Sequence, residues 1–138
     1  MATYLPDTNT IECILEKRRD AHIRIKEKLQ AVLGQNALVI MSPVVFYELA
    51  RLLYKKKAEK QLASLEKLVN FFNWCDLNRT TWESGSKLWA NCRRKGKPTG
   101  EGLDADVLIA AQAKEHDAIV VTENVRHFQY LGVNYESW

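Results

Sequence analysis

The chain has 138 residues, of which 46% are hydrophobic and 27% are charged, so we expect residues 1–138 to form one globular domain rather than a disordered chain. Twenty Lys and Arg against 17 Asp and Glu leave a net charge of +3, which permits nucleic-acid binding without requiring it. No segment approaches the roughly 18 consecutive apolar residues of a membrane span, and the three scattered cysteines form no zinc motif, so we expect a cytoplasmic protein without membrane contact.

The first half of the chain alternates short apolar runs with segments of helical periodicity. The predicted order is a strand over 3–5, a helix from about residue 11, a helix over 22–33, a strand over 37–41, and helices over 43–54 and 59–72. We expect Gly34 to be a left-handed residue that ends the second helix. Ser42 as N-cap and Pro43 in the first helical position mark the start of the third.

The second half continues the alternation. It is predicted to hold a strand over 74–77, a helix carrying Trp82 and Trp89, a loop over 95–100, an Ala-rich helix over 103–116, and strands over 118–121 and 133–135. Thr80 or Thr81 is the expected N-cap of the first of these helices. Continuous apolar strands need cover on both faces, so we predict an α/β fold with a central parallel sheet of about four to five strands flanked by helices. Ligands of such folds bind beyond the carboxyl ends of the strands.

Two carboxylates of the first half are candidates for a site at that edge. Asp7 directly follows the first strand, where it either caps the next helix or faces a ligand. Glu48 shares a helical face with Val45, Leu49 and Leu52, which places a charge within an apolar stripe. Burying an unpartnered carboxylate is costly, so Glu48 needs a proton or a cation, and Arg51 one turn later is a possible partner.

Polar residues of the second half map to the same edge. Asp104 and Asp106 open the Ala-rich helix, where negative charge also suits the helix dipole. Residues two apart on a helix point to nearly opposite sides, so we assign Asp104 to the cap and Asp106 to the site. Asn124 follows the strand that ends at Val121. A set of oxygen ligands without Cys or His suits Mg²⁺ or Mn²⁺, which can activate water for attack on a phosphodiester.

Four segments of the chain resemble the signature segments of the PIN domain, and more narrowly those of the small VapC-type ribonuclease toxins. They are Asp7-Thr8-Asn9, the helical segment Tyr47–Arg51, the run Asp106–Ala113, and the run Val121–Phe128. The resemblance spans almost the whole chain in the same order. It implies a single PIN-like domain that hydrolyses RNA.

The resemblance also implies roles for individual residues. The acids of the metal site map onto Asp7, Glu48 and Asp106, and the supporting polar groups onto Thr8 or Asn9, Thr122 and Asn124. The fourth site position, often Asp in the family, is Asn124 here, so a second metal ion would need Asp104. The implied partners are RNA, a small inhibitory antitoxin protein and a second copy of the chain. Pro6 departs from what a central strand should contain, because proline donates no backbone hydrogen bond.

An acidic site that acts on RNA also needs cations at its rim. We predict that Arg93, Arg94, Lys95 and Lys97, which precede the Ala-rich helix, contact RNA. Lys55-Lys56-Lys57 is interpreted as solvated charge at a helix end.

Other classes of α/β protein fit less well. A receiver domain needs an acidic pair on the first strand, where only Asp7 stands, and a dehalogenase-like phosphatase needs an acid at the position of Asn9. A non-catalytic RNA- or protein-binding module on a PIN scaffold remains the alternative, although the presence of all three acids argues against it.

Overall fold

Five short parallel strands form one sheet in the order β3-β2-β1-β4-β5. The structure is a computed structural model that describes residues 1–96 and 103–138. The strands are β1 (Thr3–Pro6), β2 (Leu38–Met41), β3 (Asn73–Trp74), β4 (Ile119–Val121) and β5 (Tyr135–Glu136). The predicted α/β class and the parallel sheet are confirmed, although β3 and β5 are only two residues long.

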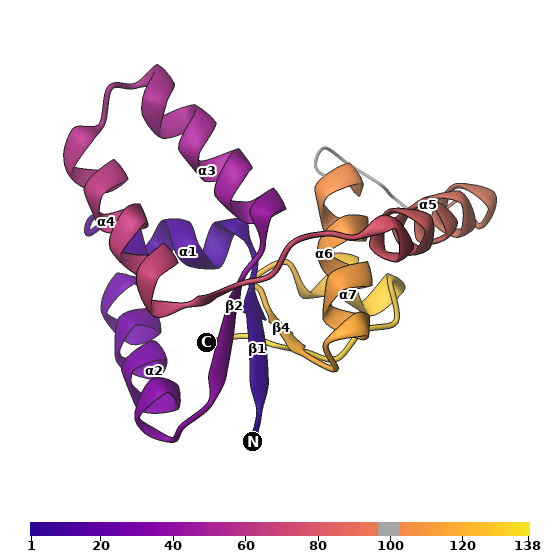
Figure 1. Ribbon diagram of the computed structural model, residues 1–138, viewed down its shortest axis with the longest axis horizontal. Helices are drawn as coiled ribbons and strands as arrows, with labels where there is room; N and C mark the ends of the chain where they lie inside the picture. The colour runs from indigo at the N-terminus through magenta and orange to yellow at the C-terminus, as the bar shows by residue number, and fades with distance from the viewer. Residues whose placement is uncertain (97–102) are drawn as a thin grey trace.

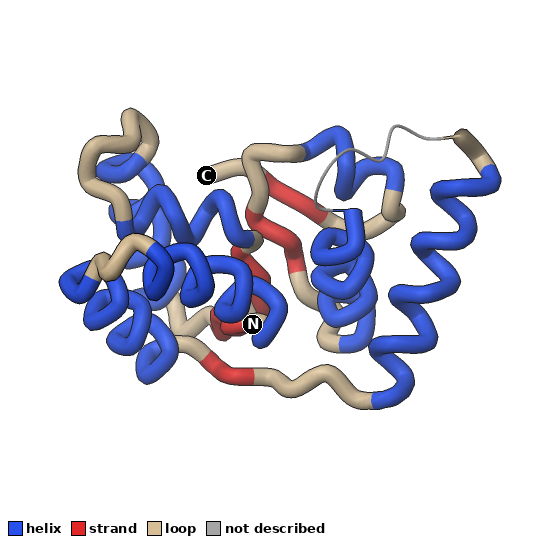
Figure 2. Tube along the Cα trace, turned by 90° about the horizontal axis from the view of Figure 1, so that it is seen from above, coloured by secondary structure: helices blue, strands red, loops and turns tan. Residues whose placement is uncertain are grey.

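Seven helices connect and cover these strands in the described ranges. They are α1 (Thr8–Leu15), α2 (His22–Gly34), α3 (Pro43–Lys55), α4 (Glu59–Phe71), α5 (Arg79–Arg94), α6 (Leu103–Glu115) and α7 (Val125–Tyr130). Figure 1 shows α1 to α4 on one side of the sheet and α5 to α7 on the other. The view from above in Figure 2 shows the strands between these two groups of helices. Both faces of the sheet are therefore covered, which explains its continuous apolar strands.

The order of the strands reverses beside β1. The chain first builds outward from β1 through β2 to β3, and then returns to place β4 on the other side of β1. Crevices at the carboxyl ends of strands flanking such a reversal are where α/β proteins bind ligands. The fold thus directs the search for a site to the end of β1, where Asp7 stands.

Pro6 stands at the carboxyl end of the central strand, where pairing continues with β4 but not with β2. The backbone N–H of Asp7 donates to the carbonyl of Val121 on β4 at 2.9 Å. Successive residues of a strand address opposite neighbours, so the nitrogen of Pro6 faces β2. The register between β1 and β2 ends at Tyr4 and Val39. Proline has no N–H to offer there, so the ladder between β1 and β2 stops before residue 6, while pairing with β4 continues to Pro6 and Val121.

Two predicted helix ends were wrong. The N-cap of α5 is Asn78, whose Oδ1 accepts a 3.0 Å bond from the N–H of Thr81, while Thr81 Oγ1 accepts a bond from the N–H of Asn78. Thr81 is thus the reciprocal residue of a capping box rather than the cap. Gly34 lies within α2, and the left-handed residue after the helix is Asn36, with φ of 62°. Asn tolerates that conformation better than most residues with a side chain.

The core fills both layers between sheet and helices. Ile11 of α1 and Val45 of α3 are fully buried on one side, and Ala110 of α6 and Phe128 of α7 on the other. On the second side α5 packs against α6 at Gly85, where a Cβ atom would lie 2.8 Å from Leu108 Cδ2. Within the described part of the chain, no helix has the length and apolar character needed to cross a membrane.

Candidate active site

Asp7 is both the N-cap of α1 and a member of the candidate site. Its Oδ1 accepts a 3.0 Å bond from the N–H of Thr10, and its Oδ2 accepts a 2.6 Å bond from Thr122 Oγ1. The residue is only 4% exposed. Burial raises the pKa of the Asp7 carboxyl, and the bonds from Thr122 and Thr10 oppose that rise. The capping interpretation is therefore confirmed, and the role of Asp7 in a ligand site stays a prediction.

Glu48 reaches the same edge from α3. Its Oε1 accepts a 2.5 Å bond from Thr8 Oγ1, so the first helix orients the carboxylate of the third. The predicted apolar stripe was wrong in one member, because Leu52 is 45% exposed while Val45 and Leu49 are buried. The stripe is narrower than predicted, and Glu48 lies at its border, half-buried.

Arg51 is not the partner of Glu48. Its guanidinium lies over the ring of Tyr47, 5.0 Å from the centroid, in a cation–π contact. No ion pair to Glu48 occurs among the residues that the structure describes. The negative charge of Glu48 is therefore held by a neutral hydroxyl and stays available to a cation.

Asp106 completes the group from α6. His127 Nδ1 lies 2.8 Å from Asp106 Oδ2, and both side chains are largely buried, at 20% and 15% exposure. Burial raises the pKa of Asp106 to about 6, the contact with His127 opposes this rise, and the charges of Asp7 and Glu48 add to it. The negative charges of Asp7 and Glu48 thus lie near enough to Asp106 to affect its carboxyl group.

A series of short polar contacts links Asp7 to Asp106. Thr122 Oγ1, which donates to Asp7, accepts a 2.8 Å bond from the N–H of Asn124. Asn124 Nδ2 in turn lies 2.9 Å from His127 Nδ1, which contacts Asp106. Thr122 is fully buried. The loop between β4 and α7 therefore fixes the positions of two of the three acids.

Sequence reasoning missed the roles of Thr10 and His127. Each stands three residues after a residue that was identified, Thr10 after Asp7 and His127 after Asn124. Residues three apart at the start of a helix lie on one face, and this spacing was the available signal.

Other predicted site residues lie apart from this network. Asn9 is exposed on α1, and Thr8 rather than Asn9 contacts an acid. Asp104 is exposed in the first turn of α6, after Leu103, so it is not the cap residue to which we assigned it. Arg93, Arg94 and Lys95 lie exposed at the end of α5, which Figure 1 shows away from the sheet. Lys97 lies outside the described residues.

The donor chemistry of the three acids fits a hard divalent ion. In the described residues no three Cys, His, Asp or Glu side chains form a ready metal cage. Mg²⁺ does not need one, because it binds through one or two carboxylates and keeps several waters. The mutual repulsion that helps raise the pKa of Asp106 is what such an ion would relieve. His127 approaches Asp106 as the supporting group of a ligating carboxylate does.

Comparisons with known proteins agree with this geometry. A family model described as PIN domain matches residues 4–132. The chain is 29% identical to the tRNA(fMet)-specific endonuclease VapC of Salmonella typhimurium, over 100% of this chain and 99% of that protein. It is 28% identical to ribonuclease VapC1 of Haemophilus influenzae, over 98% and 97% of the two chains.

Solved structures show the same fold. DNA-bound VapBC from Salmonella typhimurium superposes with a TM-score of 0.82 at 26% identity, covering 100% of this chain and 99% of that one. VapBC-1 from nontypeable Haemophilus influenzae gives a TM-score of 0.78 at 25% identity, covering 99% and 98%. Both superpositions cover nearly every residue of the two chains compared, so no large insertion or missing element separates this fold from the folds of those two proteins.

Proposed function

The chain belongs to the PIN domain family and is of the VapC type, and we propose that it is a divalent-metal-dependent endoribonuclease, the toxin of a toxin–antitoxin pair. The observation that carries this proposal is that Asp7 and Glu48 lie near enough to Asp106 for their charges to raise its pKa, while each acid contacts a hydroxyl or an imidazole. Relatives that span nearly the whole chain are named endonuclease and ribonuclease.

The proposed roles of the residues follow from their contacts. Asp7, Glu48 and Asp106 are the candidate ligands of Mg²⁺ or Mn²⁺, and exposed Asp104 is a candidate for a second ion. Such an ion, when bound, supplies an activated water and neutralises charge on the phosphodiester. Thr8 orients Glu48, and Thr122 orients Asp7. His127 of α7 contacts Asp106, and Asn124, directly before α7, contacts His127.

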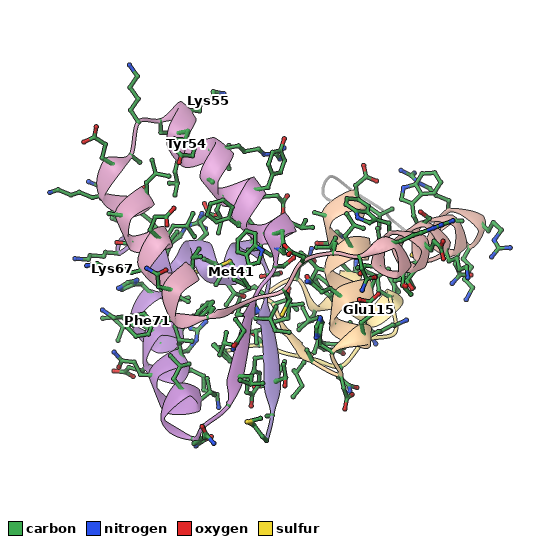
Figure 3. All side chains as sticks on the ribbon, viewed as in Figure 1. Met41, Tyr54, Lys55, Lys67, Phe71 and Glu115 are labelled. Carbon is green, nitrogen blue, oxygen red and sulfur yellow. The ribbon has the colours of Figure 1, made fainter. Side chains whose placement is uncertain are left out.

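RNA that extends from this acidic centre along α5 is expected to contact cations at the far end of that helix. Arg93, Arg94 and Lys95 remain the predicted contacts, and Arg93 is braced over the ring of Trp89, 5.2 Å from its centroid. Lys55 lies at the end of α3 far from the sheet, as Figure 3 shows, which supports its interpretation as solvated charge. Binding that uses these cations should weaken steeply as salt rises from about 50 to 200 mM, and unchanged affinity would contradict the assignment.

The proposed protein partner is a small antitoxin, since solved relatives of 25% and 26% identity are VapBC complexes. Association of two copies of the chain, which the family resemblance implies, remains a prediction. Sedimentation at several protein concentrations would measure it directly.

The test of the catalytic proposal compares Asp7→Asn with Asp20→Asn, a change at an exposed carboxylate between α1 and α2. With Mg²⁺ and a cellular RNA mixture, we expect Asp7→Asn to lose about a hundredfold or more in cleavage rate, and Asp20→Asn to match the original protein. Chelation by EDTA should abolish cleavage, and added Mg²⁺ should restore it. Unchanged cleavage by a folded Asp7→Asn protein would refute the site, and cleavage in EDTA would refute the role of metal.

A further inference from the structure

A cavity of about 730 Å³ opens beside Glu48, between α3 on one side and α5 and α6 on the other. Glu48 belongs both to the candidate metal site and to the wall of this cavity. A hydrated ion needs far less space, and cavities of roughly 300–1,000 Å³ are typical of sites that hold an organic ligand. The proposed hydrolysis of a phosphodiester at Glu48 leaves most of this space unexplained.

The walls of the cavity present aromatic faces to solvent. Tyr47 on α3 is 61% exposed, and Trp82 on α5 is 54% exposed. The guanidinium of Arg51 lies against the Tyr47 ring and adds a flat cationic surface to the same wall. Leu77 and Leu108 supply apolar lining. Exposed aromatic side chains and an Arg plane are what proteins use to stack unpaired bases of RNA.

We propose that this cavity is a base-binding subsite, in which one unstacked base next to the cleaved phosphate stacks on Trp82. The inference rests on the proposed function, because an RNA strand whose phosphate reaches Glu48 must place a neighbouring nucleotide close to that side chain. Glu48 lines the cavity, so that neighbouring nucleotide lies at the cavity's edge. The subsite would make cleavage depend on the identity of one base.

The polar lining indicates which bases fit. Asp76 is positioned at the cavity by Trp74, whose Nε1 donates to Asp76 Oδ1 at 2.7 Å. No described residue bonds the other carboxylate oxygen, which is therefore available to N–H groups of a base edge. Guanine, adenine and cytosine present amino groups, whereas uracil presents one N–H between two carbonyl oxygens. Uridine at the bound position is thus expected to be disfavoured, and Asp76→Asn should reduce that discrimination.

The test uses a short RNA with one cleavage site and a set of variants in which each flanking nucleotide in turn lacks its base. Stacking of one base is worth about 1–3 kcal/mol, so removing the base that enters the cavity should lower kcat/KM about 5- to 150-fold. Trp82→Ala should lower kcat/KM on the intact RNA by a similar factor. On the RNA that lacks the base bound in the cavity, the same substitution should lower kcat/KM by almost nothing more. Trp82→Phe should recover most of the loss.

Phe71→Ala is the matched control, because Phe71 is 74% exposed and does not line the cavity. Figure 3 shows it at the end of α4. It should cleave every RNA of the set like the original protein. Equal losses for Trp82→Ala on intact and all abasic RNAs, or no loss at all, would overturn the subsite. Normal cleavage by Trp82→Ala together with lost inhibition by an antitoxin would assign the cavity to a protein partner instead.

A binding measurement separates this proposal from the catalytic one. In the Asp7→Asn background, RNA affinity can be measured by fluorescence anisotropy without cleavage. Trp82→Ala should weaken binding of the intact RNA but not of the RNA that lacks the base bound in the cavity. If the original protein cleaves no RNA, the proposed function fails, and the binding experiment still decides the subsite. In this binding experiment, the subsite would be refuted if the loss of affinity from Trp82→Ala were the same on every abasic RNA as on the intact RNA.

Discussion

Replacing Asp106 by Asn should stabilise the folded protein at neutral pH. Burial raises the pKa of this carboxyl from 3.8 to about 6. At about 1.4 kcal/mol per pH unit, this difference corresponds to about 3 kcal/mol as an upper limit for the free energy of unfolding. Asn keeps the shape of the side chain and a group that can bond His127, but carries no charge to desolvate.

The pH dependence has a defined sign. The folded protein holds the proton of Asp106 more tightly than the unfolded chain does, so the group favours folding fully below pH 3.8. That contribution is lost as pH rises through about 6. In urea unfolding of the metal-free protein, the free energy of unfolding should therefore decline between pH 4 and pH 7.5. The decline should be smaller for Asp106→Asn than for the original protein, by up to about 3 kcal/mol.

Asp104→Asn is the control on the same helical turn. Asp104 is exposed near the N-terminus of α6, where its charge suits the helix dipole, so neutralising it should cost about 0.3–1 kcal/mol. The two neighbouring substitutions are thus expected to act in opposite directions at pH 7. Parallel stability curves for the original protein and Asp106→Asn across this pH range would refute the claim that burial of the Asp106 charge is costly.

Two further predictions concern orientation and packing. Thr8→Val removes the hydroxyl that donates to Glu48, and it should lower Mg²⁺ affinity about 10- to 100-fold with little change in melting temperature. Calorimetry measures this affinity, and an unchanged value would show that Glu48 needs no such support. Gly34→Ala, at a helical position with open space, should add about 0.5–1 kcal/mol to the free energy of unfolding. Gly85→Ala should gain less or lose stability because of Leu108, and equal gains in urea unfolding would contradict the close packing of α5 on α6.

The sequence predicted the helices well because their apolar spacing is a property of each segment alone. The parallel sheet followed from strands that alternate with those helices and from the apolar run before Thr122. The helix ends were harder. Asn78 and Thr81 are both good capping residues, and only the three-dimensional bond pattern shows that Asn78 caps and Thr81 reciprocates.

Side-chain partnerships across the fold were beyond sequence reasoning. Arg51 stood at salt-bridge spacing from Glu48, yet it lies over Tyr47, and the contact of Glu48 comes from Thr8, 40 residues away in sequence. The contact between Asp106 and His127 likewise bridges two helices. Periodicity assigns a residue to a face, but the identity of its neighbour depends on how helices from distant segments meet.

The position of β4 beside β1 ties the candidate site to the order in which the chain is synthesised. Until residue 119 has emerged, β1 has an unpaired edge on one side, although its other side can already pair with β2. Thr122 and His127, which hold two of the acids, come later still. A ribosome making this protein therefore carries a nascent chain in which the candidate site is incomplete until His127 has been added, although Asp7 and Glu48 are synthesised much earlier.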